Sequence, residues 1–142
     1  MGLDMYLYKK TFLYTGEWVR EDKRCEVTVT EGGEPHPFIN PKKIEYIVDE
    51  VGYWRKANQI HQWFVEKVQK GQDDCKEYSV DYEQLRDLLN ACEDVLEDHS
   101  KAEQLLPRSS GFFFGSTDYD DYYFEQVQNT YDILMSIVSA GD

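Results

Sequence analysis

The chain lacks the features that identify several large classes of protein. Its three cysteines, Cys25, Cys75 and Cys92, form no C-x-x-C pair, so we expect neither a disulfide framework nor a zinc site. No apolar run reaches the roughly 18 residues that a membrane helix needs, and the N-terminus has no apolar signal-peptide core. We therefore expect a cytoplasmic protein with reduced thiols.

Basic residues are scarce in the second half of the chain. Residues 1–71 hold 11 Asp and Glu against 11 Lys and Arg, whereas residues 72–142 hold 17 against 4. The whole net charge of −13 therefore lies in the second half. Because binding to phosphates requires Lys and Arg, we expect no direct binding to nucleic acid or to a membrane surface. The acidic half serves either solubility or attraction of a basic protein partner.

The chain does contain enough apolar and aromatic sequence for one compact domain over residues 1–142, with 41% hydrophobic and 15% aromatic residues. Alternating apolar and polar residues predict strands over 3–8 and 25–30, and β-branched and aromatic residues predict a third over 44–51. After Trp54 the apolar period changes to 3.6 and predicts three helices. The expected fold class is α+β, with a small antiparallel sheet of about three strands in the N-terminal part followed by three helices.

Each predicted helix carries an apolar stripe. The first stripe is Ala57, Ile60, Phe64 and Val68, and Gly71 is a plausible stop. The second predicted helix has an N-cap at Asp81, and Gln84 three residues later completes a capping box. Its apolar stripe is Leu85, Leu88, Leu89, Cys92, Val95 and Leu96. The third begins near Asp120 and Asp121, whose charges suit a helix N-terminus, and ends near Ser139.

Polar and aromatic residues gather at the start of the first predicted helix. Trp54, Asn58 and His61 fall on one strip at the border of its apolar face, and Arg55 flanks that strip. A tryptophan stacks on rings, an asparagine reads donors and acceptors, and an arginine binds phosphate or carboxylate. The same residues are equally compatible with a packed core, a boundary histidine and an arginine paired with one of many carboxylates.

A second unusual segment is GFFFGSTDYDDYY over residues 111–123. Backbone N–H groups at a helix N-terminus bind anions, so the glycine, serine and threonine before the last helix are a candidate phosphate-binding site. The spacing differs from that of a P-loop, nearby aspartates oppose a phosphate, and capping of the last helix is the alternative. The candidate ligand-binding residues from this segment are Phe113, Gly115, Ser116, Thr117 and Tyr119.

Metal, cofactor and catalytic motifs are not indicated. Asp118, Asp120 and Asp121 lack the calcium-loop pattern, and we expect no cofactor. Cys75 stands beside acidic residues that make it a poor nucleophile. His61 is the one candidate general base, so catalytic residues remain unknown and we expect a binding protein rather than an enzyme.

The opening MGLDMYL, the central YWRKANQIHQWF and the late GFFFGSTDYD together resemble a family of small uncharacterised proteins encoded by bacteriophages, prophages and their bacterial hosts. The similarity spans nearly the whole chain. The resemblance implies a location in the host cytoplasm and an accessory or counter-defence role.

Three hypotheses of function follow. The protein binds a nucleotide-like small molecule between the first helix and the GFFFGST segment. Alternatively, its acidic half binds a basic host protein by imitating nucleic acid, or it is a hydrolase or transferase that uses His61 on a nucleotide-like substrate. A homo-oligomer is also open, through a strand edge at 25–30 or the apolar side of the last helix.

Overall fold

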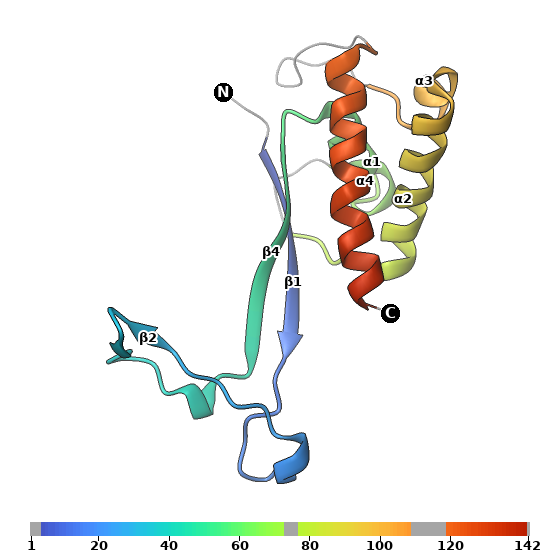
Figure 1. The fold of residues 1–142 in the computed structure, drawn as a ribbon. Helices are drawn as coiled ribbons and strands as arrows, with labels where there is room; N and C mark the ends of the chain where they lie inside the picture. Colours follow the sequence, from blue (N-terminus) through green and yellow to red (C-terminus); the bar gives the residue numbers. More distant parts are fainter. Residues whose placement is uncertain (1–3, 73–76, 109–118, 142) are drawn as a thin grey trace. The chain divides into compact units, whose positions relative to one another are not determined.

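The computed structural model describes residues 4–72, 77–108 and 119–141. The chain forms two compact units. The helical unit comprises Met1–Tyr6 with Val51–Asp142, and the ribbon unit comprises Leu7–Glu50. Strands and helices are both present, so the predicted α+β class is confirmed (Figure 1).

The strands form two small two-stranded sheets. β1 (Asp4–Phe12) pairs with β4 (Tyr46–Arg55), and the strands run in opposite directions in Figure 1. β2 (Thr30–Glu31) pairs antiparallel with β3 (Glu34–Pro35) around Gly32 and Gly33, both of which have positive φ. Positive φ at both central residues is the requirement of a tight hairpin turn, and glycine meets it without steric cost. Two 3₁₀ turns, η1 (Glu21–Lys23) and η2 (Pro41–Lys43), complete the ribbon unit.

The strand predicted over residues 25–30 is wrong for most of its length. Only its last residue, Thr30, belongs to a strand. The N–H of Cys25 donates to the carbonyl of Tyr14, and the carbonyl of Val29 accepts from the N–H of His36, so these two groups make isolated hydrogen bonds and not a ladder. Alternation suits a pleated surface, but a strand also needs a neighbour along its edge.

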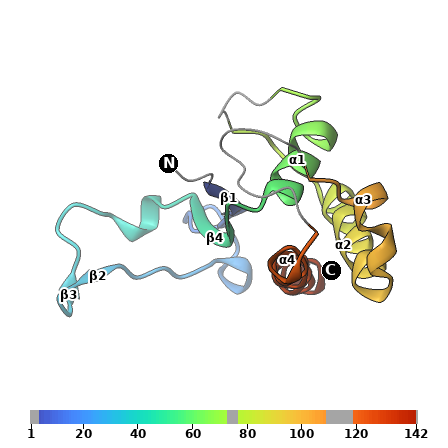
Figure 2. The same ribbon diagram turned by 90° about the horizontal axis from the view of Figure 1, so that it is seen from above.

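The helical unit contains the three predicted helices and one short addition. They are α1 (Asn58–Lys67), α2 (Tyr82–Glu97) and α4 (Asp121–Gly141), together with α3 (Ala102–Leu105) and the 3₁₀ turn η3 (His99–Lys101). The predicted cap of α2 is confirmed as a full capping box, in which Asp81 and Gln84 each accept from the other's backbone N–H. α2 and α4 lie side by side in both Figure 1 and Figure 2.

The apolar stripes of these helices meet in one core. Ile60 of α1, Leu88 and Val95 of α2, and Val127 and Leu134 of α4 have no exposed surface. Burial of each such side chain stabilises the fold by about 1.5–3 kcal/mol. Packing of α2 against α4 places the end of α2 beside the beginning of α4, where the candidate site lies.

Tyr123 fixes the first turn of α4. Its ring is fully buried, and its hydroxyl donates to the carbonyl of Leu106 at 2.6 Å. Burial raises the pKa of Tyr123 well above its ordinary value, so the phenol keeps its proton. The side-chain amide of Gln59 in turn donates to the backbone carbonyl of Tyr123. Tyr123 therefore joins α4 both to α1 and to Leu106, the residue that follows α3.

Candidate functional site

An open recess of about 440 Å³ lies where α2 ends and α4 begins. Its walls come from the last turn of α2, from η3 and from the first two turns of α4. The lining residues are Leu96, His99, Tyr119, Asp120, Asp121, Phe124, Glu125 and Gln128. All of them belong to the helical unit.

Two aspartate caps shape the walls of the recess. The Asp120 carboxylate accepts from the backbone N–H of Tyr123 at 3.0 Å, which starts α4. The Asp98 carboxylate accepts from both the hydroxyl and the backbone N–H of Ser100, which starts η3. These hydrogen bonds lower the pKa of Asp98, so its carboxylate stays charged at pH values at which an ordinary aspartate takes up a proton.

Aromatic rings form the apolar part of the recess. The His99 imidazole is stacked on the Phe124 ring, with 3.8 Å between centroids and 13° between planes. Phe124 meets the buried Tyr123 edge-on at 4.9 Å, and Tyr119 meets Tyr123 at 5.0 Å. The Tyr119 hydroxyl also accepts from the backbone N–H of Arg108, which holds it at the rim.

This combination of groups is suited to a cation. Asp120, Asp121 and Glu125 are exposed carboxylates, and the ring of Phe124 lies among them. An ammonium or guanidinium group is attracted both by carboxylates and by the face of an aromatic ring. Among the residues that the structure describes, no group of three His, Cys, Asp or Glu could hold a metal ion.

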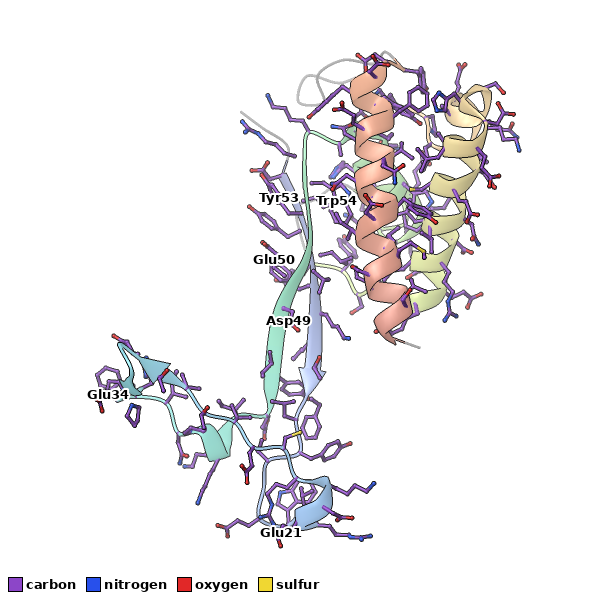
Figure 3. The ribbon with its side chains drawn as sticks, in the orientation of Figure 1. Glu21, Glu34, Asp49, Glu50, Tyr53 and Trp54 are labelled. Atoms are coloured by element: carbon purple, nitrogen blue, oxygen red, sulfur yellow. The ribbon has the colours of Figure 1, made fainter. Side chains whose placement is uncertain are left out.

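The predicted ligand residues Trp54 and Asn58 lie in the core. Trp54 belongs to β4, not to α1, so the helical strip that linked it to Asn58 and His61 does not form. Its indole N–H donates to the Thr130 hydroxyl of α4 at 2.8 Å, and the side chain points toward α4 in Figure 3. Trp54 is 3% exposed and Asn58 is fully buried. Both are therefore packed away from solvent.

The other predicted residues are dispersed. Arg55 is exposed at the end of β4, and His61 is half-buried with both ring nitrogens shielded from solvent. Tyr119 lines the recess, whereas Trp54, Arg55, Asn58 and His61 do not. Phe113, Gly115, Ser116 and Thr117 lie outside the described residues.

Some of the residues that line the recess could have been recognised from the sequence. Asp120 and Asp121 were expected at a helix start, and they are there. Their proximity to His99 depends on the packing of α2 against α4, which no local pattern encodes. The acidic-aromatic run DYDDYYFE was the available clue to a cation site.

The acidic residues around the recess belong to a wider acidic surface. The helical unit holds 19 Asp and Glu against 8 Lys and Arg. Exposed carboxylates continue from the recess along the end of α2 and into η3 and α3, as Glu93, Asp94, Glu97, Asp98 and Glu103. Between described residues, the two ion pairs are Arg20–Asp22 and His36–Glu31, both within the ribbon unit.

A second recess, of about 410 Å³, lies within the ribbon unit. It is lined by Phe12, Leu13, Thr15, Gly16, Trp18, Lys42, Lys43 and Glu45. The Thr15 hydroxyl donates to the carbonyl of Ile44 at 2.9 Å, which ties the loop after β1 to the segment before β4. Its lining mixes charges of both signs with exposed rings.

Comparison with protein-family models, with curated proteins and with solved structures gives no match to this chain. Within the described ranges, no helix combines the length and apolar character needed to cross a membrane.

Proposed function

We propose that the protein is a binding module for a basic protein partner, whose lysine or arginine side chain enters the recess at the start of α4. One observation carries this proposal: Asp120, Asp121 and Glu125 share a recess with the stacked rings of His99 and Phe124. Carboxylates supply the charge attraction, and the rings supply a flat face for the alkyl stem or the guanidinium plane.

The surrounding carboxylates support a protein partner over a small cation. Glu93, Asp94 and Glu97 extend the negative surface along α2, beyond the reach of a single side chain. A potential of one sign over such an area speeds the encounter with an oppositely charged surface and fixes its orientation. The resemblance to phage-encoded proteins narrows the proposal to a basic host protein that binds nucleic acid, with the carboxylates standing in for phosphates.

The first test measures binding of an oligolysine and an oligoarginine peptide by calorimetry. Glu125→Lys should weaken binding at least tenfold, because it places a like charge in the recess. Asp87→Lys is the matched control: it makes the same change of charge at an exposed position on α2 outside the recess lining. Equal loss of affinity in both variants would mean that net charge, and not the recess, attracts the peptides.

The second test addresses imitation of nucleic acid. A host protein captured by the chain should be released by duplex DNA and by salt, since exposed charge pairs are screened over about 8 Å at physiological ionic strength. Charge reversal at Glu93, Asp94, Glu97 and Asp98 should weaken the capture. Capture that resists both DNA and salt would contradict imitation while leaving the recess proposal intact.

A second candidate function, binding of an anionic nucleotide-like molecule beside Arg55, has one observation in its favour. Gln126 donates to the carbonyl of Lys56 at 3.2 Å and accepts from the guanidinium of Arg108 at 3.4 Å. Lys56 follows Arg55 directly, so Gln126 links Arg108 to the backbone of the turn that carries these two basic residues. The buried Trp54 and Asn58 play no direct part in this version.

This candidate is tested by thermal unfolding against a panel of nucleotides. A ligand at 100 times its Kd adds about 2.7 kcal/mol to the free energy of unfolding. Arg55→Ala should abolish the shift, while Arg86→Ala, an exposed arginine on α2, should retain it. A shift that survives Arg55→Ala would refute binding at this position.

A further inference from the structure

The ribbon unit buries almost nothing. All residues of 7–50 are described, and Val19 is the single buried residue among them. Chain segments of this size usually need disulfides, a metal or association to be stable, and a two-stranded sheet is marginal by itself. Cys25 is the segment's one cysteine and is free, and no metal-binding group is found among the described residues. A segment with so little buried surface exposes apolar side chains that are candidates for an interface.

Exposed rings form a continuous patch on this unit. Phe12 contacts Tyr46 at 5.3 Å and Tyr14 at 4.7 Å between centroids, and Tyr14 contacts Trp18 at 6.4 Å. Tyr8 lies on the same face of β1 as Phe12, because residues four apart in a strand share a face. Their exposed fractions range from 41% for Phe12 to 77% for Trp18.

The size of this aromatic patch (Tyr8, Phe12, Tyr14, Trp18 and Tyr46) approaches that of an interface. An aromatic side chain offers about 200 Å² for burial, so the exposed fractions of the five rings amount to roughly 500 Å². A standard interface buries about 800 Å² on each partner. The patch would therefore supply most of one side of a stable interface.

The charges on this face carry both signs. Lys10 lies between Tyr8 and Phe12 on β1, with its ammonium 4.2 Å from the centre of the Tyr46 ring. Asp49 and Glu50 are consecutive exposed residues of β4, so strand alternation places one of their two carboxylates on this face. Asp49 and Glu50 are labelled on β4 in Figure 3. A purely basic or purely acidic partner would meet like charge here, whereas a second copy of the face is complementary to it.

We infer that the aromatic face of the ribbon unit is a two-fold interface between two copies of this chain, in which Lys10 of each copy meets the carboxylate that Asp49 or Glu50 places on this face of the other. Two-fold contacts require a surface that complements itself, and one lysine and one carboxylate among aromatic rings satisfy that requirement. This interface differs from both surfaces considered from the sequence, the strand edge at 25–30 and the apolar side of the last helix.

The interface is tested by sedimentation velocity of the full chain over a range of concentrations. The wild-type chain should sediment as a dimer, and Trp18→Ser should weaken the dimer at least tenfold, because large aromatic side chains dominate interface energies. Phe38→Ser is the matched control, since Phe38 is a 92% exposed ring in another loop of the same unit, outside the patch. A wild-type monomer at every concentration, or equal effects of the two variants, would overturn the inference.

Charge exchange tests the pairing of the two copies. Lys10→Glu and the double change Asp49→Lys with Glu50→Lys should each weaken the homodimer about tenfold, because each puts like charges face to face. An equimolar mixture of the two variants should form a heterodimer, since each carries the charge that the other now needs. Circular dichroism of each variant checks that the fold is retained. A mixture that stays as monomeric as its components would overturn the assigned pairing.

Discussion

The imidazole of His99 lies flat on the phenyl ring of Phe124, with 3.8 Å between their centroids. The stack joins η3 to the second turn of α4 and makes a flat aromatic wall beside the exposed carboxylates of Asp121 and Glu125. Neither ring alone would define the recess, because the contact exists only when α2 and α4 pack together.

Replacement of Phe124 by leucine should weaken peptide binding while leaving the fold intact. Leucine keeps an apolar side chain of similar size but lacks the negative face of the ring, which is worth about 0.5–1 kcal/mol at an exposed site. The Kd for oligoarginine should rise about twofold to fivefold in calorimetry. Phe38→Leu, a change of the same kind at an exposed loop position, should leave the Kd unchanged. An unchanged Kd in Phe124→Leu would remove the ring from the recognition of basic side chains.

The Trp54–Thr130 hydrogen bond should matter for stability. Thr130→Val keeps the shape of the side chain but leaves the buried indole N–H of Trp54 without its 2.8 Å acceptor. The expected loss is about 1–3 kcal/mol in the free energy of unfolding, measured by urea denaturation. Thr28→Val, at an exposed position of the ribbon unit, should change stability little. A neutral Thr130→Val would show that water or another acceptor satisfies the indole.

The parts of the fold that depend on neighbouring residues in the chain could be predicted. The capping box of Asp81 and Gln84 and the stripe of α2 are encoded within one helix, and the structure has both. The strand over 25–30 failed because strand formation requires a partner distant in sequence. The short pairing of Thr30 with Pro35 is different, because it is local and depends on the two-glycine turn between them.

The candidate site could be predicted only in part for the same reason. Tyr119 was chosen from the sequence and lies in the recess, but its partners His99 and Phe124 were not grouped with it. Trp54 was assigned to a ligand-binding strip because the start of α1 was counted from it. The chain instead turns at Lys56, whose φ is 53°, and this turn leaves Trp54 on β4. A positive φ at a lysine has no local sequence signal.

Gly52 should not tolerate a side chain. A methyl group at this position would lie 2.9 Å from the Trp54 ring and 3.1 Å from the Ile133 side chain, closer than carbon atoms pack. Gly52→Ala should therefore lower the free energy of unfolding by about 1–3 kcal/mol, as overpacked cores do. Thermal unfolding with tryptophan fluorescence measures both the loss and any displacement of the Trp54 indole. An unchanged melting temperature would show that β4 and α4 separate easily at this point.

Because of Cys92, the stability of the fold should fall as the pH rises through the alkaline range. Burial raises its thiol pKa from 9.0 to about 12. In the unfolded chain the thiol loses its proton above about pH 9, whereas the folded state holds it, so stability falls as pH rises from about 9 toward about 12. Between about pH 8 and about pH 10.5 the free energy of unfolding of the wild type should fall by about 2 kcal/mol more than that of Cys92→Ala. The two proteins are compared by how steeply their stability changes with pH, because the substitution also changes the absolute stability. Cys25→Ala removes an exposed thiol and should keep the wild-type slope. Equal slopes in all three proteins would mean that Cys92 is ionised as readily in the folded state as in the unfolded chain.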